Sequence, residues 1–595
     1  MKRQLAMIFF APKGASCRGT FLRGAFLNGA LLRGALLGGA VLSGALLLPS
    51  VALAQAVPDA GTIMRDIEQL RRPDAPVLSP QAVPEAPVKP DPDALTFVVK
   101  RFELTGVTLV PIVQVQAALE PWLDRPITFE DLERGLNAIS ELYQKDGWYV
   151  RPQLPAQDIV DGTVIINVIE GKLGQVDPGI SADMPLSADR VRRFIKARQL
   201  PGEPLNMDEL SRAITILNEQ PGVSAQAALA PSLDPGASDV IVETVRLPSV
   251  SGSLQADNWG ARSTGYYRVT GSANWNNPFG IGDQLQANVL GSEGTVYGRL
   301  GYSLPVGYDG WRLGLSASAL YYKLIGEFAS LDSRGTAETL AASATYPLVR
   351  QPLRNTTLSI TGSDSHYNNR NLTDKNNKRV SLAALGLTGD EADNLLGGGF
   401  SVYGLTLTSG YAKLGDKTLD QLGPNTYGTF FTLAGNGGRL QRLTNTTSLW
   451  FSFSGQMANR NLDSSQRFSL GGPQGVRAYP VNEGTGDQGL LASLEARYDF
   501  YPGAQASLFY DFGWIQQFKS ATHLSPDARL VAGPNEYNLQ GWGAAISYNY
   551  NNRLSMKFTV ASRIGKNPAA NFLTGADGDG TNDQTRFWFN VVLAL

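Results

Sequence analysis

The chain has 595 residues, the length of about four ordinary domains, and 17% of them are charged, against a usual fraction of about 25%. Lys and Arg (51) balance Asp and Glu (53), which excludes the basic surface that a nucleic-acid-binding protein needs. One cysteine, Cys17, and two histidines, His366 and His523, exclude a disulfide framework and argue against a Cys- or His-based metal site. We therefore expect no metal and no cofactor.

The first 54 residues have the composition of a secretory signal peptide. They contain six basic residues and no acidic residue, and an apolar stretch at 34–48 leads to the small-residue cleavage pattern Ala52-Leu53-Ala54. The apolar stretch is shorter than the about 20 residues that a membrane-spanning helix needs. We predict cleavage after Ala54, which leaves an exported chain without cysteine, as suits an oxidising compartment.

Residues 55–72 and 73–94 predict two short segments of different character. Ile63, Ile67 and Leu70 fall on one face of a helix at 60–72. So short a helix is marginal alone, so we expect this face to lie against another part of the protein, although a frayed N-terminus remains the alternative. The seven prolines of 73–94 predict an extended, semi-rigid linker.

Residues 95–171 and 172–247 read as two copies of one α/β unit. Each has two amphipathic helices followed by two strands, and Leu132, Arg134 and Ile139 have counterparts 78 positions later. Units of about 75 residues bury little core, so we expect the two to brace each other. The predicted elements are a strand at 97–104, helices near Pro111 and from Phe129, strands at 148–154 and 163–170, then helices at 188–197 and 207–219 and strands at 223–229 and 239–245.

From residue 248 to residue 595 the pattern changes to alternation with a period of two, interrupted by Gly-, Asn- and Asp-rich turns. One face of each segment is apolar and the other is polar, and the polar face carries charges such as Glu495, Arg497 and Lys557. The solid core of a β-sandwich or solenoid would not accept these charges, whereas the wet interior of a membrane barrel does. Aromatic residues near strand ends also fit the interfacial girdles of a barrel.

Two motifs give the chain a family resemblance: SLGGPQGVRAYP, which begins at Ser469, and FYDFG, which begins at Phe509. In these motifs and in the order of its parts, the chain resembles the outer-membrane transporters of two-partner secretion, the haemolysin-activator and filamentous-haemagglutinin type of the Omp85 superfamily. The stretches TGVT, YQKDGW, LPAQDI and VIEG of the first unit are similar to a POTRA (polypeptide-transport-associated) domain. The resemblance implies a transmembrane β-barrel of about 16 antiparallel strands, two N-terminal periplasmic α/β POTRA domains and an N-terminal plug-like helix.

The same resemblance assigns the site residues. In that family a loop folds back into the barrel lumen, here residues 469–480, and its tip motif matches Val476, Arg477, Ala478 and Tyr479. Ala478 stands where the family has glycine, and alanine resists the positive φ that glycine permits. The family's tip arginine meets an acidic residue of a barrel-wall motif, which matches Phe509, Asp511 and Gly513; the alternation of strand 508–514 also turns Asp511 toward the lumen.

The resemblance also implies partners and a place in the cell. The partners would be a secreted exoprotein in unfolded form, such as a large β-helical adhesin or cytolysin, together with outer-membrane lipid and the barrel assembly machinery. We expect a monomer in the outer membrane of a Gram-negative cell, with the POTRA domains in the periplasm and transport without ATP.

Two other functions remain as alternatives at this point. The first is an Omp85-type assembly factor (insertase) for barrel proteins, against which the short string of two POTRA repeats argues. The second is an outer-membrane enzyme, because Ser363, Asp364, Ser365 and His366 are crowded in the sequence. Neighbours on one loop seldom form a catalytic triad, and 367–371 reads as a solvated loop, so we expect no enzyme activity.

Overall fold

The computed structural model describes residues 58–68, 96–179, 183–372, 374–522, 533–571 and 574–595. The predicted signal peptide (1–54), the linker (73–94), His523 and Leu70 lie outside these residues. Among the helices described, none is both long and apolar enough to cross a membrane. The first described element is the helix α1 (Ala60–Glu68), the part of the predicted helix 60–72 that the structure describes.

Residues 97–170 and 172–246 fold into two α/β units of the same topology. The main sheet of each unit has three strands, in the orders β2-β5-β4 and β6-β8-β7. The central strand, β5 or β8, is parallel to β2 or β6 and antiparallel to β4 or β7. The first unit comprises β1 (Phe97–Val98), β2 (Arg101–Thr105), α2 (Ile112–Leu119), β3 (Pro126–Ile127), α3 (Phe129–Gln144), β4 (Val150–Gln153) and β5 (Thr163–Glu170). The second comprises β6 (Lys172–Pro178), α4 (Ala188–Lys196), α5 (Met207–Asn218), β7 (Val223–Pro231) and β8 (Ala237–Arg246).

These elements follow from local sequence signals. Thr128 and Asp131 form a capping box that starts α3, and the side chain of Asn206 accepts the first free N–H groups of α5. The predicted strand 97–104 is interrupted, because 97–98 pairs with β3 while 101–105 joins the main sheet. Backbone hydrogen bonds link the units, from Tyr149 to Leu205 (2.9 Å) and from Met207 to Gly147 (2.7 Å).

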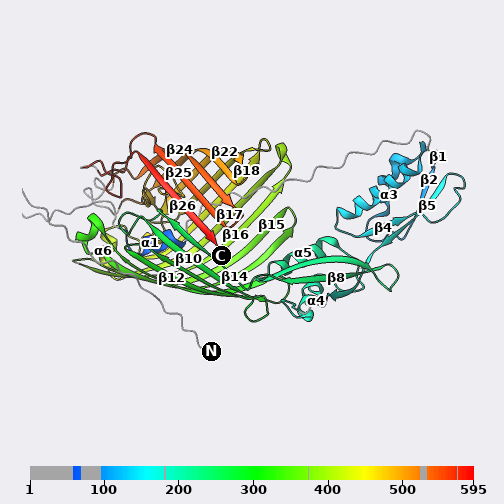
Figure 1. Ribbon diagram of the computed structural model, residues 1–595, viewed down its shortest axis with the longest axis horizontal. Coiled ribbons are helices and arrows are strands. Elements are labelled where there is room, and N and C mark those ends of the chain that lie inside the picture. Colours follow the sequence, from blue (N-terminus) through cyan, green and yellow to red (C-terminus); the bar gives the residue numbers. More distant parts are fainter. Residues whose placement is uncertain (1–57, 69–95, 180–182, 373, 523–532, 572–573) are drawn as a thin grey trace, which may run out of the picture. The chain divides into compact units, whose positions relative to one another are not determined.

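Sixteen strands of the described chain close into one antiparallel barrel (Figure 1). Neighbours in sequence are neighbours in the barrel, and β26 pairs with β9 to close it. The barrel strands are β9 (Val250–Asp257), β10 (Arg268–Asn276), β11 (Gln284–Gly291), β12 (Thr295–Val306), β13 (Trp311–Lys323), β14 (Arg334–Gln351), β15 (Arg354–Arg370), β16 (Lys375–Asp393), β17 (Gly399–Leu414), β18 (Gly428–Arg442), β19 (Thr447–Ala458), β22 (Gln488–Tyr501), β23 (Ala504–Gln516), β24 (Glu536–Tyr550), β25 (Leu554–Arg563) and β26 (Thr585–Ala594).

Alternation sorts the strand residues between two faces. On β22, Leu490 and Leu494 are exposed on the outside, whereas Ser493 and Glu495 are buried on the lumen side. This arrangement is the reverse of a soluble sandwich, because the large apolar side chains cover the exterior. The prediction of a barrel of about 16 strands is confirmed.

The crowded segment Ser363–His366 lies in the middle of β15 and not on a loop. Ser365 is buried on the lumen face, while the side chains of Asp364 and His366 project from the opposite face. The prediction of a solvated loop at 367–371 is wrong for 367–370, which continue the strand. The apolar alternation is weak there because Tyr367 is followed by polar residues on both faces of the strand.

Candidate functional site

The connection between β19 and β22 (residues 459–487) folds back into the barrel lumen. It contains a one-turn helix, η4 (Ser464–Gln466), and a two-stranded hairpin of β20 (Phe468–Ser469) and β21 (Thr485–Gly486). A short bridge between Gly471 and Val476 bends the tip of the lumen loop 469–480. Val476, Ala478 and Tyr479 are fully buried against the barrel wall, in one cluster with Phe509 and Leu539.

Arg477 is held by the wall strands β22 and β23. Its Nε and Nη2 atoms donate to the two carboxylate oxygens of Asp511 at 2.8 and 2.7 Å, and Nη1 donates to Glu495 at 2.7 Å. Ser493 accepts a further hydrogen bond from Nη2 at 3.0 Å and itself donates to Asp511 at 2.7 Å. The guanidinium lies 3.3 Å from the centroid of the Phe509 ring.

The network fixes the backbone of the tip as well as its side chain. The N–H of Arg477 donates to Asp511 (3.1 Å), and its carbonyl accepts from the indole N–H of Trp588 on β26 (2.7 Å). Arg477, Asp511 and Glu495 are all nearly inaccessible to solvent. A buried ion pair contributes little net stability, but removal of one partner leaves a buried charge without its counter-charge. The network therefore holds the loop tip in one position on the barrel wall.

Glycines of the wall make room for the loop. A Cβ on Gly513 would lie 2.8 Å from the side chain of Leu470, and a Cβ on Gly541 would lie 2.6 Å from the Cβ of Ala478. Ala478 is not among the described non-glycine residues with positive φ. Alanine therefore fits at position 478 because the wall residue that faces it, Gly541, has no side chain.

Helix α1 lies inside the same barrel (Figure 1). Ile63 is buried and Ile67 partly buried, in a cluster with lumen side chains that include Tyr322 and Phe430. These two residues are the part of the predicted Ile63–Ile67–Leu70 face that the structure describes.

Polar contacts fix both ends of α1. Lys378 of β16 is buried, and its ammonium group contacts Asp59 (2.7 Å), Asp463 (2.9 Å) and Ser464 (2.6 Å). At the other end of the helix, Glu68 accepts hydrogen bonds from Tyr297 (2.7 Å) and Ser318 (2.8 Å). Lys378 thus joins the helix, the barrel wall and the β19–β22 connection at one point.

Arg65 ties the middle of α1 to the β19–β22 connection. Its guanidinium donates to the carbonyls of Ser464 (3.2 Å) and Arg467 (3.1 Å) and to the side chain of Asn482 (2.8 Å). The helix and the connection therefore occupy the lumen as one hydrogen-bonded unit.

Sequence reasoning missed most of these partners. Glu495 was recognised as a charge on a polar strand face, but Ser493, Trp588, Lys378 and Asp59 had no motif. The alternation of each strand could have placed the first three side chains in the lumen. Only closure of the barrel determines which strands face one another across the lumen.

The first α/β unit contains a half-buried polar cluster around Glu170. Burial opposes ionisation of Glu170, but hydrogen bonds from the hydroxyl of Thr108, the N–H groups of Leu109 (2.8 Å) and Thr108 (2.6 Å) and the Tyr143 hydroxyl (2.8 Å) outweigh it. The pKa of Glu170 is therefore held below its usual value. This carboxylate stabilises the fold above its ordinary pKa, and the contribution is lost as pH falls through its lowered pKa.

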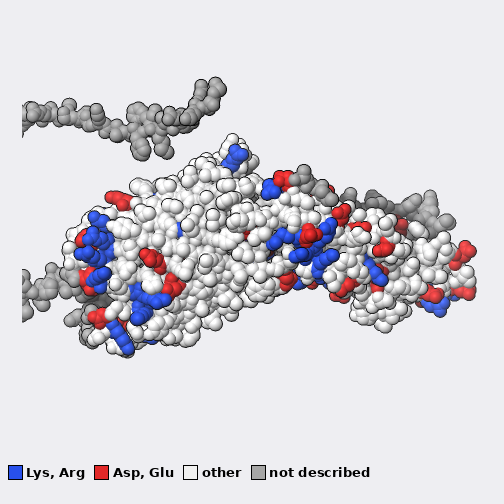
Figure 2. Space-filling model, turned by 90° about the horizontal axis from the view of Figure 1, so that it is seen from below, with Lys and Arg blue, Asp and Glu red and all other residues white. Residues whose placement is uncertain are grey.

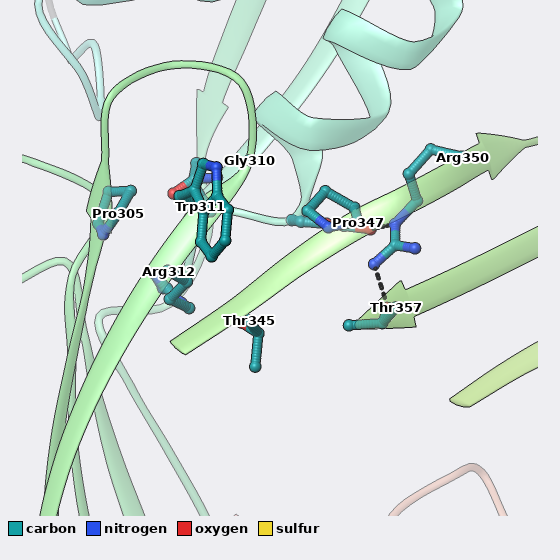
Figure 3. Close-up of a pocket in the computed structure, with 10 residues that line it drawn as sticks. Pro305, Gly310, Trp311, Arg312, Thr345, Pro347, Arg350 and Thr357 are labelled. Atoms are coloured by element: carbon teal, nitrogen blue, oxygen red, sulfur yellow. Dashed lines mark hydrogen bonds and ion pairs between the residues drawn. The ribbon is translucent and has the colours of Figure 1, made fainter. Parts of the chain in front are cut away.

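The second α/β unit is bonded to the β12–β13 turn and to the last residues of β14. Arg198 pairs with Asp309 (2.7 Å), Arg212 donates to the carbonyls of Pro347 and Leu348, and Glu219 pairs with Arg350. Figure 3 shows the small pocket at this junction, where Trp311 and Pro347 approach each other and Arg350 donates to Thr357 (2.9 Å). Both cations of the lining have partners, because Arg350 pairs with Glu219 and Arg312 donates to the carbonyl of Gly282 (2.8 Å).

Comparison with known proteins identifies this architecture. Residues 236–534 match the family model described as haemolysin secretion/activation protein ShlB/FhaC/HecB, and residues 97–171 match the POTRA domain of ShlB type. The chain belongs to the haemolysin secretion/activation family. It is an outer-membrane transporter of the two-partner secretion type.

Relatives match along most of this transporter. The heme/hemopexin transporter protein HuxB of Haemophilus influenzae (strain 86-028NP) is 26% identical over 92% of this chain and 96% of its own length. The outer membrane transporter CdiB of Dickeya dadantii is 26% identical over 71% of this chain and 76% of its own. The structure of CdiB from Escherichia coli, 20% identical, covers 86% of this chain and 93% of its own with a TM-score of 0.66, and supports the fold.

Proposed function

We propose that this transporter captures an unfolded exoprotein through its POTRA units and passes it, without ATP, through the barrel once α1 has left the lumen. The observation that supports the proposal is that two elements, α1 and the lumen loop 469–480, pack against lumen side chains of the barrel. Hydrogen bonds, ion pairs and apolar packing hold both, and these contacts can break and re-form. The chain contains no GxxxxGK[ST] phosphate-binding loop, so folding of the cargo outside would make its passage directional.

The cargo is proposed to be large, extended and able to fold only after passage, as a β-helical adhesin or cytolysin would be. A barrel whose lumen is lined by polar groups suits a chain in extended form, because the lumen can solvate a passing backbone. Such a chain can also add to an open sheet edge by main-chain hydrogen bonds.

The edge of β7 is the sheet edge that best suits this capture. It runs over nine residues and, within the described chain, pairs only with β8. The edge strand β4 has four residues and contains Pro152, which lacks an N–H donor. The edge of β6 is covered by 202–205, whose backbone bonds to Leu173.

The proposal is tested by secretion from cells that express this chain together with a large exoprotein gene adjacent to its own. We expect the exoprotein in the medium or at the cell surface only when the chain is present. Deletion of 95–171 should abolish export and leave a barrel that is still heat-modifiable on gels. If the exoprotein stays periplasmic while other barrel proteins mis-assemble without this chain, an assembly role replaces the proposal.

A single substitution tests the β7 edge. The N–H of Ala225 already bonds to Asn218 on the outer edge, so the N–H of Ala227, two residues on, points the same way. Ala227→Pro should remove that donor without breaking the ladder to β8 and should lower export severalfold. Ala227→Val keeps the donor and serves as the control. Equal export by both variants would show that the β7 edge does not capture the exoprotein.

A further inference from the structure

The two ends of the barrel can be told apart by their connections. The second POTRA unit leads into the start of β9, and the turns at that end are short, such as 502–503 and 551–553. The connections at the opposite end are long, such as 459–487 and 564–584. In barrels of this kind short turns face the periplasm and long loops face outside, so the ends of β13, β15 and β17 lie at the outer surface.

The outward residues of β13 mark the lipid-facing band. They run from Trp311, near the periplasmic turn, through Leu313 and Leu315 to Tyr321, all of which are exposed. Ten residues of strand span about 33 Å, or about 25 Å across a membrane at a tilt of about 40°, which is the height of an apolar band between aromatic girdles. Lys323 is the next outward residue, so it stands at the level of the outer lipid headgroups.

Cations continue from Lys323 around the outside of the barrel. Lys323 is directly opposite Arg334, Arg334 is opposite Arg370, and Arg370 is opposite Lys375, so four cations form one row across β13–β16. Like charges directly opposite on one sheet face destabilise the pair. Within the described chain, Lys323, Arg370 and Lys375 take part in no ion pair with an acidic residue, which leaves the row open to an external anion.

A second group extends this row to β17. Arg379 is opposite Lys413 on one side and His366 on the other. Four acidic side chains lie nearby: Asp364 pairs with Arg379 (2.8 Å), Asp332 lies 4.0 Å from Arg334, Glu338 is opposite His366, and Asp374 accepts the N–H of Lys375 (2.7 Å). These acids are fewer than the six cations that we call the outer cation belt, namely Lys323, Arg334, Arg370, Lys375, Arg379 and Lys413.

The belt is confined to one side of the barrel. On three other strands the outward residues toward this end include no cation: Thr429 on β18, Met457 on β19, and Glu536 and Asn538 on β24. Figure 2 shows Lys and Arg gathered at the left end of the barrel, followed by a broad band of uncharged residues. A girdle that only marked the interface would run around the whole barrel, so its confinement points to a localised ligand.

We propose that the outer cation belt binds lipopolysaccharide of the outer leaflet through the phosphate groups of its lipid A headgroup. Several phosphates on one lipid match several cations spaced along neighbouring strands, and the acyl chains would lie against the apolar band below. Arg and Lys are the side chains suited to phosphate recognition. The belt would fix lipid on the β13–β17 side of the barrel.

The test measures lipid A binding by the purified full chain in detergent. The test variant is Lys323→Gln, Arg370→Gln, Lys375→Gln, Lys413→Gln, and the control removes four exposed cations from the POTRA units as Arg101→Gln, Lys145→Gln, Lys172→Gln, Lys196→Gln. We expect the test variant to bind bis-phosphorylated lipid A at least about tenfold more weakly, and the control to bind it as the parent chain does. Heat-modifiability on gels shows that each variant is folded.

Three further results would decide the source and nature of the ligand. Dephosphorylated lipid A should bind the parent chain as weakly as lipid A binds the variant. Inorganic phosphate should not displace lipid A at equal concentration, since the acyl chains contribute to binding. Unchanged lipid A binding by the test variant would overturn the proposal, and a fall in secretion at unchanged lipid binding would assign the belt to cargo instead.

Discussion

The lumen loop 469–480 and helix α1 occupy one barrel but are held in different ways. Arg477 at the loop tip is enclosed by two carboxylates, a hydroxyl and an aromatic ring, and its backbone is fixed on both sides. The helix contributes four apolar residues, Ala60, Ile63, Met64 and Ile67, with ionic anchors at Lys378 and hydrogen bonds at Arg65 and Glu68. This difference is why we propose that the tip sets the shape of the lumen and that the helix is the element that leaves.

The largest effect should come from Arg477→Ala. The change removes the cation that pairs with buried Asp511, while Glu495 keeps its pair with Arg497 (2.7 Å), and breaking a buried pair costs about 3–5 kcal/mol locally. We expect an inserted, heat-modifiable barrel that secretes at least about tenfold less, measured as exoprotein in the medium. Arg299→Ala is the control, because Arg299 is a lumen cation with an exposed side chain that donates to Ser316. Secretion at the parent level by Arg477→Ala would show that the pairing of Arg477 with Asp511 has no role in transport.

The next largest effect should come from Lys378→Met. Without the ammonium group, Asp59 and Asp463 face each other across one buried point, so the start of α1 is repelled from its seat. In planar bilayers we expect more frequent openings and larger conductance, approaching that of a chain without residues 60–72. Lys375→Met, a substitution of an exposed lysine three residues away, should leave conductance unchanged. If Lys378→Met does not open the channel either, the anchor is not what keeps the helix in place.

Steric fit between the tip and the wall gives a smaller, reversible effect. In Gly541→Ala the new Cβ would lie 2.6 Å from the Cβ of Ala478, so the tip must shift and secretion should fall severalfold. Ala478→Gly alone should have little effect, and the double variant should recover secretion. Failure of the second change to rescue the first would show that the tip does not sit against Gly541 during transport.

The smallest effect should come from Tyr297→Phe. This change removes one of the two hydrogen bonds that Glu68 accepts at the end of α1, worth about 1.5–3 kcal/mol for a charged acceptor. We expect a modest rise in the frequency of channel opening with no change in single-channel conductance. An effect as large as that of Lys378→Met would contradict the ranking of the two anchors.

Much of this architecture could be predicted from the sequence. Alternation predicted which face of each barrel strand is apolar, and the amphipathic spacing of apolar residues from 129 and at 207–219 predicted the second helix of each POTRA unit. The positions of Arg477 and Asp511 came from motifs, because a pattern with a period of two says which face a residue is on but not which strand lies opposite. Lys378 could not be assigned to Asp59 at all, since 319 residues separate them and only barrel closure brings them together.

A reversible link between α1 and the β19–β22 connection tests the central claim most directly. A Cβ on Gly61 would lie 3.1 Å from the Cβ of Ser465, less than the about 3.5–4.5 Å of a disulfide, so a shift of a few tenths of an ångström permits the bond; Cys17 is the one native cysteine. In cells expressing Gly61→Cys with Ser465→Cys, secretion is measured before and after reduction, with each single variant as control. Our account predicts that oxidation stops export and that reduction restores it. Normal export by the fully linked chain would show that cargo passes while the helix remains in the lumen, and would contradict the account.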